Sequence, residues 1–220
     1  MKKITLILLG LFSITLSHAQ EVVSNNQNGI IIVGGNDTTK TDDPICVHTN
    51  GLCMNFPKAG LTGMYNPALG WSISECNYSD GRSVKYESLL LICTASDTYY
   101  SFNNDSRVLI RFTDESVSTL RRDLNSPIEK KYENMWMGNT LMNFYHTYCR
   151  LNLDAETRQK LLNPALGIVK IRIVFTNGNV KDYELKGNRV KKFPEELRES
   201  FKQAAAGNKK RLQNSDDSTF

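Results

Sequence analysis

Two cysteines and a histidine lie close together in the segment ICVHTNGLC, residues 45–53. Three such side chains fall short of a structural zinc site, which needs four ligands and commonly has C-x₂₋₄-C spacing. A redox pair would instead need C-x-x-C at the start of a helix. We therefore predict a disulfide between Cys46 and Cys53, closed by the turn-prone segment 49–51 in an oxidising compartment, with His48 a bystander. We expect neither a metal nor a cofactor.

The connectivity of this disulfide is not fixed by the sequence. The chain has five cysteines, so at least one is free or pairs outside the chain. The alternative to the Cys46–Cys53 bond joins Cys46 to Cys76, Cys93 or Cys149, and it would tie the segment to the remainder of the fold.

We predict that Cys149 is a buried free thiol. In an extended strand, Cys149 shares one face with Tyr145 and Leu151, whereas His146 points to the other face together with Tyr148 and Arg150. Cys149 and His146 therefore cannot form a nucleophile–base pair without a bulge.

Catalytic motifs of known mechanism are absent from the sequence. It contains no G-x-S-x-G elbow, no H-E-x-x-H helix, no phosphate-cradling loop and no dinucleotide fingerprint. We predict no catalytic residues, and we keep a secreted hydrolase as the rival hypothesis. In that case His48 or His146 would have to serve as the general base.

The first residues, MKKITLILLGLFSITLSHAQ, have the pattern of a secretory signal peptide. Lys2 and Lys3 precede an apolar run, and the small-x-small sequence at residues 17–19 predicts cleavage before Gln20. The run is too short to span a bilayer, so we expect no transmembrane segment in the mature chain. We predict an exported protein that is periplasmic, secreted or at the cell surface.

The charge balance excludes strongly electrostatic partners. The formal charge of the whole chain is +4, and it becomes +2 when Lys2 and Lys3 are removed. Such a chain lacks the basic excess that is typical of nucleic-acid binding, so we expect no nucleic acid as partner.

The hydrophobic patterns predict antiparallel strands joined by short turns. WSISECNY and SVKYESLLLIC form one hairpin, with an Asp-Gly turn signal, and RVLIRFT and VSTLRR form a second. LMNFYHTYCRLN has the aromatic and β-branched content of a strand, whereas YENMWMGN is not assigned. The Ile30–Val33 run is a candidate short strand.

Two helices are expected. The first is LDAETRQKLLN, with Asp154 as the N-cap and Pro164 ending it. The second should begin at Pro194 and end at Gly207, with Leu197, Phe201 and Ala204 or Ala205 along one stripe.

The hairpin IVKIRIVFTNGNVKDYELK permits a prediction of register. A three-residue loop over residues 176–178, with Gly178 left-handed, places Lys170 opposite Glu184 and Arg172 opposite Asp182. Apolar residues then share the inner face. A two-residue loop would instead place one strand's apolar set in solvent.

The signal sequence and the strands, helix and hairpin between about residues 85 and 205 resemble small uncharacterised secreted proteins of Bacteroidetes-type bacteria. The resemblance implies a location in the envelope and carries no activity.

Together these patterns predict an α+β fold with one antiparallel sheet of about six to seven strands and two short helices. We expect a signal peptide at 1–19, a flexible, irregular cysteine-containing lead-in at 20–70, a single domain at 71–207 and a disordered tail at 208–220. Aromatic residues cluster in DTYYSF, YENMWM and NFYHTY and could line a binding surface. The leading hypothesis is a non-enzymatic envelope protein that binds a protein or a glycan, or alternatively an accessory subunit of a surface complex.

Overall fold

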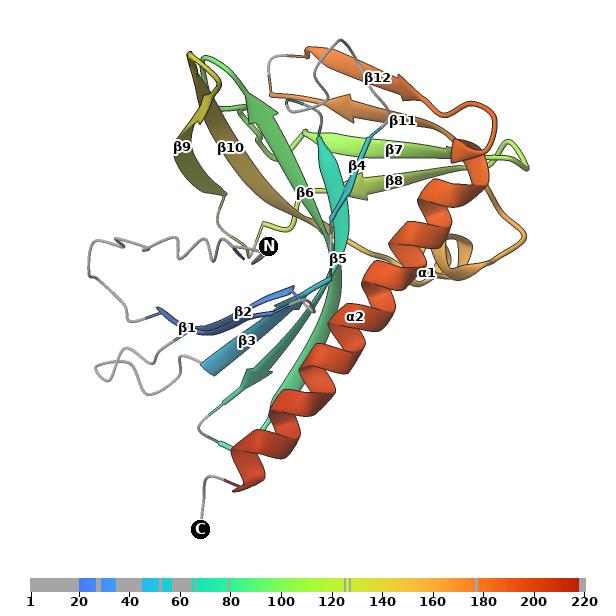
Figure 1. Ribbon diagram of the computed structural model, residues 1–220. Helices are drawn as coiled ribbons and strands as arrows, with labels where there is room; N and C mark the ends of the chain where they lie inside the picture. Colours follow the sequence, from blue (N-terminus) through green and yellow to red (C-terminus); the bar gives the residue numbers. More distant parts are fainter. Residues whose placement is uncertain are drawn as a thin grey trace, which may run out of the picture.

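The computed structural model describes residues 20–26, 29–34, 45–51, 53–56, 65, 67–78, 80–124, 126, 128–176 and 178–217. The predicted signal peptide, residues 1–19, lies outside the described residues. All strand pairs in the described part are antiparallel, and they form two sheets accompanied by two helices (Figure 1). The predicted α+β class is therefore confirmed.

The larger sheet has eight strands in the order β1-β2-β3-β5-β6-β10-β9, with β4 paired to β5. Four of these strands arise from residues 20–70, for which the sequence predicted an irregular lead-in with one candidate strand at Ile30–Val33, and β2 contains that candidate. The prediction of an irregular segment failed because strand formation depends on pairing partners, which a polar local composition does not reveal. The bounds are β1 (Gln20–Asn26), β2 (Gly29–Gly34), β3 (Ile45–Asn50), β4 (Met54–Asn55), β5 (Ala68–Asn77), β6 (Ser83–Ala95), β9 (Glu129–Met137) and β10 (Thr140–Asn152).

A smaller sheet of four strands has the order β12-β11-β7-β8. It joins two predicted hairpins through the β7–β11 pair, whose strands are far apart in the sequence. The predicted single sheet of six to seven strands is thus divided into two, because this long-range pairing leaves no local signal. The bounds are β7 (Arg107–Phe112), β8 (Val117–Arg121), β11 (Ile168–Val174) and β12 (Val180–Glu184).

The core fills the space between the two sheets and helix α2 (Arg189–Asp217), which runs along the larger sheet (Figure 1). Alternate residues of each strand face this core, as the two-residue period of a strand requires. The predicted inner face of β7 is confirmed, since Val108, Ile110 and Phe112 are buried. The remaining strand residues of the core include Leu69, Trp71, Ile73, Leu89, Leu91, Leu120, Leu151, Ile171, Ile173 and Tyr183.

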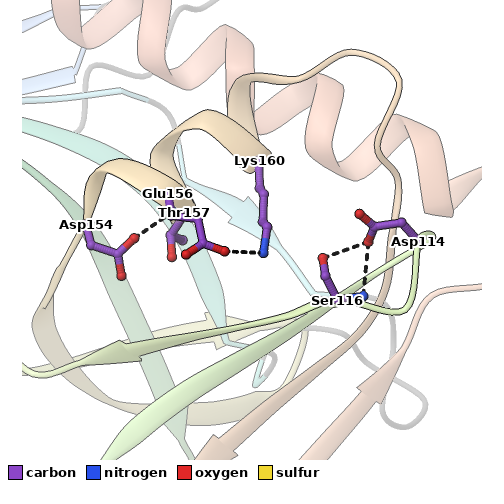
Figure 2. Close-up of polar contacts among 6 residues, drawn as sticks. All are labelled: Asp114, Ser116, Asp154, Glu156, Thr157 and Lys160. Carbon is purple, nitrogen blue, oxygen red and sulfur yellow. Dashed lines mark hydrogen bonds and ion pairs between the residues drawn. The ribbon is translucent and has the colours of Figure 1, made fainter.

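Helix α1 (Ala155–Leu162) forms where the sequence predicted it. The Asp154 side chain accepts a hydrogen bond of 2.6 Å from the backbone N–H of Thr157, which satisfies one of the free donors of the first turn (Figure 2). Glu156 and Lys160 form an i,i+4 ion pair of 2.7 Å on the same helix. Figure 2 also shows the turn between β7 and β8, which Asp114 closes by accepting bonds from Ser116.

Helix α2 is longer than predicted. It begins at Arg189 rather than Pro194 and continues to Asp217, so the predicted end at Gly207 and the disordered tail over residues 208–217 are corrected. Pro194 therefore lies inside the helix, where it supplies no backbone N–H. The predicted stripe is confirmed, because Leu197 and Ala204 are fully buried.

The predicted register of the β11–β12 hairpin is confirmed. Lys170 lies opposite Glu184 and Arg172 opposite Asp182. Gly178 has a φ of 75° and its N–H bonds to the carbonyl oxygen of Phe175, as a three-residue loop requires.

We expect Asp182→Asn to destabilise the protein by no more than about 1 kcal/mol at neutral pH, because the pairs are partly exposed and solvent screens them. Asp182 binds Arg172 at 2.6 Å and Lys170 at 2.8 Å, and both hold its pKa well below the usual value. This stabilisation is present above the unfolded pKa of about 3.9 and is lost as the pH falls towards the lower folded value.

Urea unfolding of wild type and Asp182→Asn at neutral and acidic pH measures this contribution. The matched control is Glu184→Gln, which removes a more exposed carboxylate that contacts Lys186 at 3.3 Å. A difference between wild type and Asp182→Asn that grows on acidification would contradict the prediction.

Candidate functional site

The predicted Cys46–Cys53 disulfide is wrong, because Cys53 is a free cysteine. The segment from Ile45 to Asn50 is strand β3 rather than a tight loop, so it carries the two cysteines apart. Cys46 lies directly opposite Cys76 in the β3–β5 register, and Cys76 is disulfide-bonded. Opposite residues in an antiparallel pair have Cα atoms about 4.5 to 5.5 Å apart, within the range that a disulfide needs. The register therefore predicts Cys46 as the disulfide partner of Cys76.

The remaining thiols do not suit nucleophilic chemistry. Cys149 is free and buried, as the sequence predicted, and burial raises its pKa to about 11. Burial also raises the pKa of Cys53 to about 12 and that of Cys93 further. A thiolate is the reactive form, so these three side chains are inert at neutral pH.

Three aromatic segments that are separate in the sequence converge at the β9–β10 hairpin. The ring of Tyr145 lies 5.0 Å from that of Tyr132 and 5.1 Å from that of Tyr99, between ring centroids. Trp136 and its register partner Leu141 lie on the same face nearer the hairpin turn. We name Tyr99, Tyr132, Trp136, Leu141 and Tyr145 the aromatic surface.

Three members of the aromatic surface are exposed, whereas Tyr99 and Tyr145 are half-buried, and polar groups lie between its rings. Trp136 is 68% exposed, Tyr132 47% and Leu141 44%. Asn134 and Asn143 pair across the two strands on this face, and the Tyr132 hydroxyl donates to the Asn143 side-chain oxygen at 2.9 Å. A large apolar surface next to hydrogen-bonding amides is typical of a binding site.

A pocket of about 410 Å³ adjoins this region at the end of β6. The strand continues past Ile92, which pairs with the first residue of β5, so the last residues of β6 pair with β10 on one side and border the pocket on the side that β5 has left. The Lys181 ammonium group donates to the Tyr100 hydroxyl and lies 4.7 Å from the centre of that ring. The pocket is lined by Tyr65, Thr94, Ala95, Ser96, Asp97, Tyr100, Lys181, Asp182 and Tyr183.

His146 lies between a hydroxyl and a carboxylate on the other face of the same hairpin. Its Nδ1 atom is 3.0 Å from the Thr94 hydroxyl, and its Nε2 atom is 3.5 Å from a carboxylate oxygen of Glu133. Lys131 also pairs with Glu133. Burial lowers the pKa of His146, although Glu133 opposes this effect, so the imidazole is mainly neutral at pH 7.

No protein-family model, curated protein or solved structure matches the chain. In the part of the chain that the structure describes, no group of three or more His, Cys, Asp or Glu side chains is placed to hold a metal ion. No helix among those residues is long and apolar enough to cross a membrane. Function must therefore be argued from the aromatic surface, the pocket and the His146 contacts.

Sequence reasoning identified His146 and the aromatic segments but missed Thr94, Glu133 and Lys181. Of the two candidate histidines, His48 lies opposite Ser74 in the β3–β5 register, and His146 contacts the Thr94 hydroxyl. Thr94 and Glu133 are ordinary strand residues, and no local signal marks them. Only the pairing of β6, β10 and β9 reveals their proximity to His146.

Proposed function

We propose that the protein binds a glycan of the bacterial envelope through the aromatic surface. The observation that carries the proposal is the convergence of three tyrosine rings on the hairpin face that also presents the largely exposed Trp136. The sequence predicted a binding protein with a protein or a glycan as partner. The present proposal is more specific, because it names the aromatic surface as the binding site and a glycan as the ligand.

The chemistry of the surface favours a sugar over other partners. Pyranose rings present flat C–H faces that pack on aromatic rings, and their hydroxyl groups exchange hydrogen bonds with amides such as Asn134 and Asn143. Among the described residues on this face, Lys130 is the charged one, with its ammonium 5.4 Å from the centre of the Tyr99 ring. A nucleic acid would need many more cations.

The predicted export of the protein supports a glycan as the ligand. The lysine-led apolar segment at residues 1–19 has the pattern of a signal peptide, which would bring the protein to the periplasm or the cell surface. Polysaccharides are abundant ligands in those compartments.

We expect Trp136→Ala to weaken glycan binding at least about tenfold, equivalent to about 1.4 kcal/mol, because the ring supplies the largest exposed apolar area of the surface. Electrophoresis through native gels that contain dextran, xylan, mannan, laminarin or soluble peptidoglycan fragments measures this, since a bound polysaccharide retards the protein. The Tyr132→Ala variant should show the same effect.

The matched control is Tyr86→Ala, which removes from β6 a tyrosine that is 48% exposed, as Tyr132 of β9 is 47% exposed. Tyr86→Ala should be retarded as the wild type is. The proposal is overturned if no polysaccharide retards the wild-type protein, or if Tyr86→Ala weakens binding as much as Trp136→Ala.

A further inference from the structure

Thr94 both lines the pocket and contacts His146. Thr94 is buried from bulk solvent and is one of the residues that line the pocket, and its hydroxyl contacts Nδ1 of His146 at 3.0 Å. The other ring nitrogen faces Glu133 at 3.5 Å. A hydroxyl, an imidazole and a carboxylate are therefore arranged in series, which is the arrangement that activates a hydroxyl for attack on a carbonyl carbon.

We propose that this pocket hydrolyses a carboxylic ester, with Thr94 as the nucleophile, His146 as the general base and Glu133 as a positioning residue. The proposal goes beyond glycan binding and does not depend on it. It gives a concrete form to the rival hypothesis of a secreted hydrolase.

Strand register holds the three groups together. Thr94 and His146 are directly opposite each other on β6 and β10, and Glu133 lies opposite Phe144, the residue two before His146. All three therefore share one face of the sheet. The Phe144 ring lies 6.1 Å from the imidazole at an interplanar angle of 8°, and it stacks in turn against Tyr65, which lines the pocket.

The burial and the charges around His146 favour its neutral form, which is the form that acts as a base. Burial and the Lys131 charge lower the pKa of His146, and Glu133 raises it. On β10, burial raises the pKa of Tyr148 to about 12, so this neighbour is neutral at pH 7. Thr94 on β6 does not titrate. The neutral imidazole, which is the form that accepts a proton, therefore predominates.

The pocket wall also carries residues of the type that stabilise negative charge. Lys181, Tyr100 and Ser96 are among the residues that line the pocket. An ammonium group and hydroxyl groups are donors that stabilise the oxyanion of a tetrahedral intermediate. A volume of about 410 Å³ suits a small acyl group and part of the alcohol to which it is joined.

The reaction balances without a further reagent. Thr94 Oγ attacks the ester carbonyl carbon while His146 takes the hydroxyl proton. The C–O bond to the alcohol then breaks, and His146 returns the proton to the leaving alcohol. Water, deprotonated by His146, attacks the acyl-Thr94 ester and releases the carboxylic acid and the free hydroxyl.

Hydrolysis of p-nitrophenyl acetate by the purified chain tests the proposal. We expect turnover above the buffer rate, with acid-quenched protein carrying an acetyl group on the peptide that contains Thr94. Thr94→Ala should abolish both signals, and Thr94→Ser should retain them because it keeps the hydroxyl. Thr49→Ala, which removes another buried threonine hydroxyl, from β3, is the matched control and should keep the activity.

The pH profile separates catalysis from a structural role. The rate should rise with pH as His146 loses its proton and should reach half its maximum below pH 6.5, the ordinary pKa of histidine. Glu133→Gln should lower the rate about 10²-fold and move this midpoint further down, because Glu133 raises the pKa of His146. Glu129→Gln removes a carboxylate from the same strand face that contacts Arg150 instead, and it should change neither quantity.

The proposal is overturned if the wild-type chain gives no turnover, if the acetyl group maps to another residue, or if Thr94→Ala hydrolyses the ester as the wild type does. Retardation by polysaccharides in native gels and hydrolysis of p-nitrophenyl acetate are separate measurements on the same wild-type protein. Failure of one proposal is therefore distinguishable from failure of the other.

Discussion

Trp71→Ala is expected to lower the free energy of unfolding by about 3 to 5 kcal/mol, the range for removing a fully buried large aromatic side chain. Trp71 is 0% exposed at the centre of β5, and its ring lies 5.0 Å from that of Phe201 on α2. Its backbone N–H donates to the Ser200 hydroxyl at 2.9 Å. The substitution therefore opens a cavity where α2 meets the larger sheet.

The second tryptophan of the chain provides the control, because Trp136 is 68% exposed. Trp136→Ala should change stability by no more than about 0.5 kcal/mol. Urea unfolding followed by far-ultraviolet circular dichroism measures both variants. Equal losses of stability in the two would show that the burial described for Trp71 is wrong.

The close approach of α2 to the sheet explains why Trp71 matters. Gly51 donates its N–H to the Trp71 carbonyl oxygen at 2.8 Å, and a Cβ atom at Gly51 would lie 1.9 Å from the Ser200 carbonyl oxygen. Glycine is thus required at this position for close packing against α2. The Asn50-Gly51 pair, which the sequence presented as a turn, instead ends strand β3.

Cys76→Ser is expected to lower the stability of the oxidised protein by about 3.5 kcal/mol. A Cys46–Cys76 bond closes a loop of about 30 residues, and the entropy that this removes from the unfolded chain gives that magnitude. Thermal and urea unfolding of protein purified without reductant measures the loss. Cys46→Ser should have the same effect, and the double variant should be no less stable than either single variant, because the same bond is absent from all three.

Cys53→Ser is the matched control, since Cys53 is a free cysteine that lies near the same strands. Its replacement should cost much less than the loss of the disulfide. Peptide mapping of the unreduced protein should find Cys46 linked to Cys76. Alkylation of Cys46 without prior reduction would contradict the inference and leave Cys76 with another partner.

Features encoded within a few neighbouring residues were determined by the sequence itself. Alternation of charged and apolar residues, with a glycine able to adopt a positive φ, fixed the register in which Arg172 faces Asp182. Asp154 marked the start of α1, because an aspartate side chain satisfies the backbone donors of the first turn. Both features depend on short-range geometry, which local patterns describe.

Features that join distant segments were decided by the tertiary structure. The pairing of β3 with β5 places Cys46 opposite Cys76, and the pairing of β10 with β6 and β9 brings Thr94 and Glu133 to His146. The physical reason is that any strand with an apolar face can pair with several others. Which pairs form depends on the burial that the whole chain achieves, so the candidate site became visible only in the folded protein.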